Sequence, residues 1–384
     1  MAVVPATTTR AIFADQLRGI AALLVVVNHY TGIYWVARPL VASVTFSPAQ
    51  DGATHALALM AQAWPFNPGV FGVGLFFLIS GFVIPNAFTH HSPASFLAAR
   101  ALRIWPCYLA AMAVELIATW LSAHYWSVPF TERPVALLAN ALLVHNLLGV
   151  PTFDLVNWTL TIELKFYLLF ALAHAAIARR PGRCVLGAGV MAALLCATVP
   201  WGLAVAPGER WEMLTRGISL DLQYVPFMLV GTLFHLHGRG RLGTARLAGL
   251  TVATLALVAL GFRLTRDPVE IATVLPNYLK ALALFALAYS LRRHIGGTLV
   301  TRWLARISYP LYLVHSLVGY AMLKWLMMGV GLGYVPALAL TLASVLGIAT
   351  LLHVFVERPS IAAGRRLGRR KAARDPAGGA VATA

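Results

Sequence analysis

The chain has 384 residues, of which 59% are hydrophobic and 11% are charged, and its mean hydropathy is +0.76. Water-soluble domains carry about a quarter charged residues, so this composition excludes an ordinary soluble protein and predicts a surface that faces lipid. The formal net charge of +17 would also suit a nucleic-acid-binding protein, but the placement of the basic residues accounts for it without nucleic acid.

Ten apolar runs are long enough to cross a bilayer, which takes about 20 apolar residues. In chain order they are 17–36, 68–88, 104–123, 157–177, 184–203, 219–236, 247–264, 276–291, 307–327 and 334–356. A further stretch, VALLANALLVHNLLGV at 135–150, is short for a span and contains three polar residues. The sequence predicts an all-α integral membrane protein with about ten transmembrane helices plus one re-entrant or partial segment.

Basic residues alternate between the two sides of this arrangement. The N-terminus, every second connection and the C-terminal tail hold 21 of the 30 Lys and Arg residues. The connections on the other side, with the adjoining end of one span, hold six, and three lysines lie within spans. This is the positive-inside pattern, and it predicts that both termini are cytoplasmic. We expect an N-terminal cytoplasmic segment at 1–10, a multi-span membrane domain at 11–360, and a basic, disordered tail at 361–384.

Ionisable groups within three remote spans are expected to share one layer of the membrane. Insertion of an ionisable side chain at membrane depth costs roughly 2.5–3.5 kcal/mol, so each such residue needs a partner or a function. In ADQLRGIAALLVVVNHY, His29 lies about 16 Å along the helix from Arg18. Glu163 and His315 reach a similar depth from their own span ends. These groups are candidates for a mid-membrane site.

Polar neighbours extend two of these positions into helical faces, because residues three or four apart share a face. One face carries Thr159, Glu163 and Tyr167, and another carries Ser308, Tyr312 and His315. Lys165 points away from the first face, so we expect it to snorkel or to pair elsewhere.

Two further motifs flank these spans. Arg100 and Arg103 lie one turn apart at the start of the third span, where two guanidinium groups can clamp a phosphate or serve only as topology anchors. In GVFGVGLFFLISGF, the glycines predict close helix packing, with Ser80 in that contact or lining a cavity. A nucleophilic role for Ser80 is disfavoured, since no G-x-S-x-G elbow surrounds it.

Six sequence blocks together resemble the membrane-bound acyltransferase family 3. They are DQLRGIAALLVVVNH, GVGLFFLISGF, RALRIWP, NWTLTIELKFYLL, SYPLYLVHSL and FVERP, in this order over about residues 11–360. Members of that family O-acylate bacterial polysaccharides, lipid-linked glycans, lipo-oligosaccharide signals and macrolides. The chain resembles the stand-alone form, without a fused periplasmic esterase-like domain.

The resemblance implies a multi-pass enzyme of the bacterial cytoplasmic membrane that transfers an acetyl or other short acyl group from acyl-CoA, without a metal. Its acceptor would be the hydroxyl of a carbohydrate, a glycolipid or a glycosylated small molecule. It implies that Arg18, Arg100 and Arg103 bind the donor and that His29, Glu163 and His315 are catalytic, with roles for Trp158 and Ser308. The helical faces add Tyr312 and Tyr167 as supporting residues, and the glycine block adds Ser80.

In this hypothesis, His29 is the general base, and Glu163 orients its imidazole or stabilises its protonated form. An acyl-histidine intermediate is the competing mechanism. Two other classes stay open from the residues alone. A proton-coupled transporter would also place His and Glu at mid-membrane, although it would not need paired arginines at one edge. A structural scaffold would not need aligned polar faces on several spans.

Overall fold

The computed structural model describes residues 12–89, 92–205, 210–265 and 269–374, and within these ranges it contains helices and no strand. The longer elements are α1 (Ile12–Val27), α5 (Pro68–Val83), α6 (Pro93–Trp126), α8 (Trp158–Arg179), α9 (Pro181–Val205), α10 (Arg210–Leu222), α11 (Val225–Gly238), α12 (Thr244–Leu264), α13 (Leu275–Ser290), α14 (Leu299–Lys324), α15 (Tyr334–Leu352) and α16 (Arg358–Arg374). The shorter ones are α2 (Tyr34–Val36), α3 (Arg38–Thr45), α4 (Ala56–Gln62), α7 (Pro134–Ala141) and the 3-10 or π-helical turns η1 (Asn28–Ile33), η2 (Ile84–Thr89), η3 (His145–Leu148), η4 (Glu270–Val274), η5 (Trp325–Gly329) and η6 (His353–Glu357).

Ten helical segments of the described chain are long and apolar enough to cross a membrane. This confirms the predicted number of spans, since short turns such as η1 and η6 continue a neighbouring helix instead of ending it. The chain is therefore a multi-pass membrane protein.

The predicted partial segment is also present. Its helix α7 has eight residues and η3 has four, so at 1.5 Å per residue neither can cross a bilayer. Asn140 anchors the segment, because its amide nitrogen donates to the carbonyl oxygens of Ala136 and Pro151 while its Oδ1 accepts from the backbone of Phe153.

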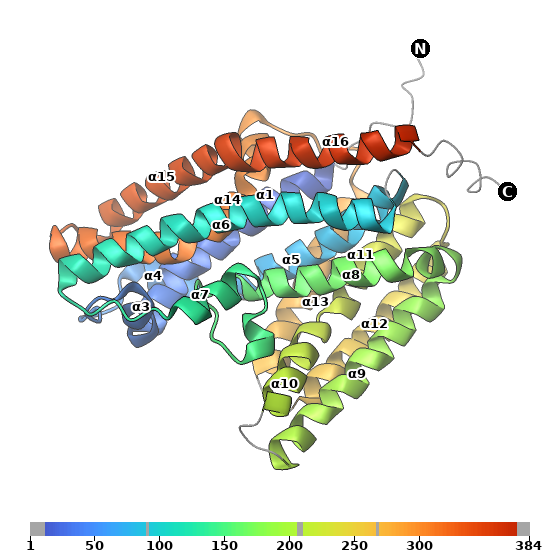
Figure 1. Cartoon of the computed structure of the whole chain (residues 1–384), viewed down its shortest axis with the longest axis horizontal. Coiled ribbons are helices and arrows are strands. Elements are labelled where there is room, and N and C mark those ends of the chain that lie inside the picture. The colour runs from blue at the N-terminus through green and yellow to red at the C-terminus, as the bar shows by residue number, and fades with distance from the viewer. Residues whose placement is uncertain (1–11, 90–91, 206–209, 266–268, 375–384) are drawn as a thin grey trace.

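The spans pack around two central helices (Figure 1). Helix α5 contacts α1, α11 and α13, and α14 contacts α1, α6 and α15. The last helix, α16, lies along α6, and α9 packs on α12 at the far side of the molecule. Helix α1 begins and α16 ends at the same end of the bundle (Figure 1), which the charge pattern predicts to face the cytoplasm.

Glycine allows α5 and α11 to approach each other closely. A Cβ on Gly81 would lie 1.7 Å from the carbonyl oxygen of Met228, and one on Gly231 would lie 2.1 Å from that of Leu78. Real Cβ atoms do not come this close to a backbone oxygen, so both positions require glycine. The prediction that the glycine-rich block serves close helix packing is confirmed here.

Three segments predicted as connections or tail are helical instead. Most of 89–103 belongs to α6, α10 occupies part of 204–218, and α16 extends through 361–374, where a disordered tail was expected. Arg, Lys and Ala are good helix formers, and α16 packs on α6 with Gly364 against Ala99. Residues 1–10 and 375–384 lie outside the described residues.

Candidate active site

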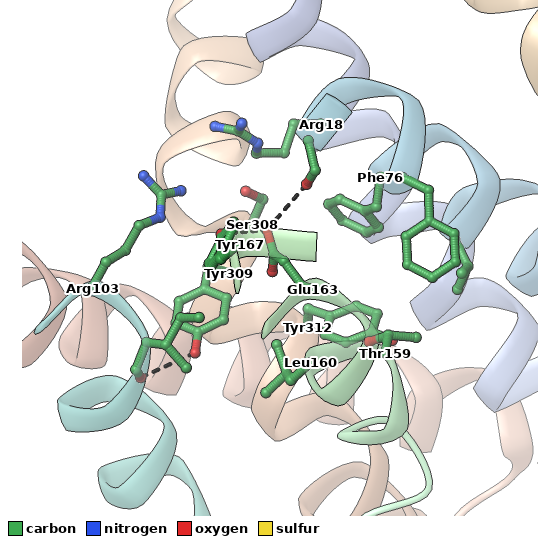
Figure 2. Close-up of a pocket in the computed structure, with 14 residues that line it drawn as sticks. Arg18, Phe76, Arg103, Thr159, Leu160, Glu163, Tyr167, Ser308, Tyr309 and Tyr312 are labelled. Carbon is green, nitrogen blue, oxygen red and sulfur yellow. Dashed lines mark hydrogen bonds between the residues drawn. The ribbon is translucent and has the colours of Figure 1, made fainter. Parts of the chain in front are cut away.

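A cavity in the middle of the bundle brings together most of the predicted site residues (Figure 2). We call it the core cavity. The predicted residues that line it are Arg18, Ser80, Arg103, Glu163, Tyr167, Ser308 and Tyr312. They come from α1, α5, α6, α8 and α14. The two arginines lie at one end, Tyr312 and Thr159 lie at the other, and Glu163 lies between them (Figure 2).

Glu163 is held in a fixed orientation by two hydroxyl groups. Ser80 Oγ and Tyr167 OH both donate to Glu163 Oε1, at 3.1 and 2.6 Å. Tyr167 lies one helical turn after Glu163, as the shared face on α8 predicts, whereas Ser80 reaches it from α5. The expected contact between Glu163 and His29 is not formed, because helical spacing gives the depth of a residue but not the rotation of its helix relative to others.

A second cavity adjoins the first and is lined by six arginines. We call it the arginine cavity. Its arginines are Arg18, Arg103, Arg306, Arg358, Arg365 and Arg366, and Glu357 and His353 also line it. Its volume is about 680 Å³, against about 80 Å³ for the core cavity. Four residues line both cavities, and they are Arg18, Arg103, Ser308 and Tyr309.

The arginines of α16 are not among the predicted site residues, because their charge alone indicates only topology. Arg358 and Arg365 are seven residues apart and therefore share a helical face. That spacing was the available signal, but only the packing of α16 beside α6 shows that the face lines a cavity.

The two arginines shared by the cavities differ in their partners. Arg18 forms an ion pair with Asp15 at 3.7 Å. Arg103 makes no hydrogen bond or ion pair to any residue that the structure describes, so its five N–H donors remain available to a ligand. Arg100 does not line either cavity. Its guanidinium lies over the rings of Phe96 and Tyr167, at 5.3 and 5.4 Å, so its predicted role in binding the donor is not supported by this geometry.

His29 and His315 form a buried pair next to the core cavity. Their rings meet edge to face with centroids 4.5 Å apart, and they are 5% and 0% exposed. Neither histidine lines the core cavity or the arginine cavity. The ring of Tyr312, which does line the core cavity, lies 5.8 Å from that of His315, so one side chain separates the pair from the cavity.

Each histidine uses Nδ1 for a hydrogen bond. His29 Nδ1 lies 2.6 Å from the hydroxyl of Tyr320. His315 Nδ1 lies 2.8 Å from the carbonyl oxygen of Tyr312 and 3.2 Å from that of Leu311. His29 is also the second residue of η1, where α1 changes from α-helical to π-helical winding, a feature frequent at functional sites.

Tyr320 was not predicted. It follows His315 by five residues, which is not a helical repeat, so periodicity gives no reason to group the two. Sequence alone offered no signal for its contact with His29, which comes from the packing of α14 on α1.

Two remaining candidates lie away from the cavities. Trp158 packs on Tyr224, with ring centroids 5.8 Å apart, and does not line the core cavity. Lys165 pairs with Asp221, which confirms that it points away from the face of Glu163. Within the described ranges, no group of three or more His, Cys, Asp or Glu side chains could hold a metal ion.

Comparisons with known proteins place this architecture in a family. Residues 12–354 match the family described as an acyltransferase domain, the acyltransferase family 3. The chain is 29% identical over 346 residues to the acyltransferase MdmB of Streptomyces mycarofaciens, and this alignment covers 80% of this chain and 85% of that protein. It is 28% identical over 313 residues to the exopolysaccharide production protein ExoZ of Rhizobium meliloti, covering 78% and 92%.

A shorter match of 120 residues, 32% identical, is to nodulation protein 10 of Rhizobium leguminosarum bv. viciae, and it covers 25% of this chain and 31% of that protein. No solved structure matches significantly. The family match extends from the start of α1 to just past the end of α15 and so includes every residue of both cavities except Glu357 and those on α16. The chain belongs to the acyltransferase family 3.

Proposed function

We propose that this protein is an acyl-CoA-dependent O-acyltransferase that transfers an acetyl or other short acyl group to a hydroxyl of a carbohydrate or glycosylated acceptor. Family membership supports the transfer of an acyl group. The observation that carries the choice of donor is the junction of the two cavities, where Arg18 and Arg103 line both.

The arginine cavity suits the nucleotide part of acyl-CoA. Guanidinium groups bind phosphates through paired, charge-assisted hydrogen bonds, and six of them surround this space. Its volume of about 680 Å³ falls in the range of about 300–1,000 Å³ typical of small-molecule sites. The core cavity, at about 80 Å³, is too small for a nucleotide and would take only the thioester end of the arm.

The donor would enter from the end of the bundle where α1 begins, which the distribution of basic residues predicts to be cytoplasmic. Its acyl group would then pass Glu163 and approach Tyr312 and the histidine pair. The acceptor would come from the opposite side. The name of ExoZ, an exopolysaccharide production protein, supports a carbohydrate acceptor.

The reaction is the attack of an acceptor hydroxyl oxygen on the thioester carbonyl carbon. A C–O bond forms, the C–S bond breaks, and CoA leaves as a thiol. A histidine takes the hydroxyl proton, a form of general base catalysis that contributes about 10²–10⁴-fold to the rate. The sequence hypothesis gave this task to His29, and the buried pair of His29 and His315 provides two imidazoles beside the core cavity.

Binding of acetyl-CoA to the purified protein in detergent tests this proposal. By isothermal titration calorimetry, the wild type should bind, and Arg103→Ala should weaken binding at least tenfold. Arg246→Ala is the matched control, since Arg246 is exposed on α12 and lines neither cavity. If the wild type shows no saturable binding of acetyl-CoA, the donor assignment is wrong.

The chemical step is measured by the release of free CoA from acetyl-CoA. Replacing His29 by Ala should abolish this release while acetyl-CoA binding persists. A proton-coupled transporter, the alternative from the sequence, would bind no acyl-CoA and release no CoA.

A further inference from the structure

The two histidines of the pair are hydrogen bonded in opposite ways, and we infer from this that they have different tasks. We propose that His315 Nε2 is the base that accepts the acceptor's hydroxyl proton, and that His29 is a hydrogen-bond donor to the thioester oxygen. The assignment rests on the proposed function in placing acyl transfer at this pair. It differs from the sequence hypothesis, in which His29 is the base.

The hydrogen bonds of His315 fix its tautomer. Its Nδ1 faces two carbonyl oxygens of its own helix, those of Tyr312 at 2.8 Å and Leu311 at 3.2 Å. A carbonyl oxygen can only accept a hydrogen bond, so Nδ1 must carry the hydrogen. In a neutral imidazole the other nitrogen then has a free lone pair. His315 therefore presents Nε2 as an acceptor.

That lone pair is buried and has no partner. His315 is 0% exposed, and no residue of the described chain donates to its Nε2. Buried polar atoms are nearly always hydrogen bonded in native structures, so an unsatisfied one needs an explanation. The hydroxyl group of a bound acyl-acceptor molecule would supply the hydrogen bond that this nitrogen lacks.

The hydrogen bond of His29 indicates the other tautomer. Tyr320 is 0% exposed, and its hydroxyl has His29 Nδ1 at 2.6 Å as its hydrogen-bond partner among the residues described. A buried hydroxyl hydrogen needs an acceptor, and Nδ1 is the acceptor that Tyr320 contacts. Tyr320 therefore donates to Nδ1, and the hydrogen of the neutral His29 ring lies on Nε2.

The reverse arrangement would leave one hydrogen without a partner. If His29 were the base through Nε2, its Nδ1 would have to carry the hydrogen and donate to the oxygen of Tyr320. The hydroxyl hydrogen of Tyr320 would then be buried with no acceptor in contact, which is costly. The packing around Tyr320 thus favours His29 as a donor and makes Tyr320 its positioning residue.

These two tautomers are complementary for acyl transfer. His29 Nε2–H would donate to the thioester carbonyl oxygen and stabilise the negative charge that develops there. His315 Nε2 would take the proton of the attacking hydroxyl as the C–O bond forms. When the C–S bond breaks, the protonated His315 would return that proton to the leaving sulfur, so that CoA departs as a thiol and His315 is neutral again.

Tyr312 lies between the histidine pair and the core cavity. The ring of Tyr312 lines the core cavity and lies 5.8 Å from the ring of His315. The hydroxyl of Tyr312 is 2.8 Å from Thr159 Oγ1 and donates to the carbonyl oxygen of Val156 at 3.3 Å. The thioester in the core cavity would therefore meet Tyr312 first, and the side chain of Tyr312 would have to move aside for the thioester to reach His315.

The first test measures the tautomers directly and needs no substrate. The full-length protein, labelled with ¹⁵N on its 12 histidines, is studied in lipid bilayers by solid-state NMR at neutral pH. The resonances lost in His315→Asn and in His29→Gln identify the two rings. We expect the hydrogen on Nδ1 of His315 and on Nε2 of His29, and the opposite pattern for either ring would overturn the proposal.

If His315→Asn does not fold, His315 is identified as the histidine whose resonances shift most in His29→Gln, since the two rings are in contact. In Tyr320→Phe, the Nδ1 resonance of His29 should change and that of His315 should stay. An unchanged Nδ1 resonance of His29 would mean that Tyr320 does not set its tautomer.

The second test separates a base from a donor by substitution. A Gln side chain can place an amide N–H near the position of imidazole Nε2, but it has no basic nitrogen. Acetyl-CoA hydrolysis, with water as the acceptor, is followed by the release of free CoA. We expect His29→Gln to lose about tenfold and His315→Asn to lose at least 100-fold in kcat. The reverse order would show that His29 is the base.

The binding of acetyl-CoA distinguishes failure of this inference from failure of the proposed function. Both variants should bind acetyl-CoA with a Kd close to that of the wild type, because neither histidine lines the arginine cavity. A wild type that binds no acetyl-CoA would refute acyl-CoA as the acyl donor, whereas the tautomers of the two histidines would still be decided by the NMR measurement. A wild type that binds and hydrolyses it, with His315→Asn equally active, would refute the role of His315.

Discussion

Ser80 on α5 and Glu163 on α8 are joined by a hydrogen bond of 3.1 Å between Ser80 Oγ and Glu163 Oε1. This contact links two spans that are 83 residues apart in sequence. Together with the hydroxyl of Tyr167, it holds one carboxylate between the arginine end and the Tyr312 end of the core cavity (Figure 2). Of the two places that the sequence allows for Ser80, the glycine contact or a cavity, Ser80 takes the second and lines the core cavity.

Loss of this hydrogen bond should slow the reaction without unfolding the protein. A hydrogen bond to a charged group contributes about 1.5–3 kcal/mol, so Ser80→Ala should lower kcat by about tenfold or more, because Glu163 is then oriented only by the hydrogen bond from Tyr167. The measurement is CoA release from acetyl-CoA. Ser290→Ala is a matched control, since Ser290 is exposed at the end of α13. Equal rates for the two variants would show that the orientation of Glu163 is unimportant.

The contact of α5 with α11 predicts a large effect of a single methyl group. In Gly81→Ala, the new Cβ would overlap the carbonyl oxygen of Met228, and overpacking of this kind typically costs about 1–3 kcal/mol, occasionally more. We expect a clearly lower unfolding temperature in detergent, measured by intrinsic fluorescence. Gly249→Ala, with open space around the glycine on α12, should be neutral or slightly stabilising. Equal unfolding temperatures for both variants would contradict the close packing.

The periodic features of this chain could be predicted from sequence, because they depend on one helix at a time. The ten spans, the partial segment and the shared face of Glu163 and Tyr167 all follow from apolar length or from a spacing of four residues. The same spacing correctly directs Lys165 away from that face, and its partner in the structure is Asp221.

Features that depend on how helices are rotated against each other could not be predicted. Glu163 was expected to contact His29, but it bonds Ser80 and Tyr167 while Tyr320 occupies Nδ1 of His29. The π-helical turn that contains His29 leaves no clear mark in the sequence. The arginines of α16 were counted by charge alone, and charge does not show which cavity they line.

The arginines of α16 should bind the donor but take no part in the chemical step. Arg365→Ala should raise the KM for acetyl-CoA by about tenfold and leave kcat nearly unchanged, since it lines the arginine cavity and not the core cavity. Added salt should raise the KM of the wild type because it screens charge–phosphate attraction. Steady-state kinetics against Arg246→Ala would test this, and a fall in kcat alone would contradict it.

Asp154 predicts a specific pH dependence of stability. It lies in the loop before α8, is 1% exposed, and accepts hydrogen bonds from the backbone N–H groups of Val156 and Asn157. Burial, which disfavours the charged carboxylate, raises the pKa of Asp154 from 3.8 to about 6. Between these two values the folded state binds more protons than the unfolded state, so the free energy of unfolding falls as the pH rises through this window.

Above pH 6 the contribution of Asp154 to stability is lost, and the loss amounts to about 3 kcal/mol. Asp154→Asn keeps the acceptor oxygen for both backbone N–H groups but cannot ionise. The variant should therefore unfold at a higher temperature than the wild type at pH 8, and this difference should shrink towards pH 4.5. Asp51→Asn, at an exposed loop position, should leave the pH dependence as it is in the wild type. If Asp154→Asn and the wild type lose stability in parallel between pH 4.5 and 8, then the carboxyl group of Asp154 ionises in the folded protein as readily as in water.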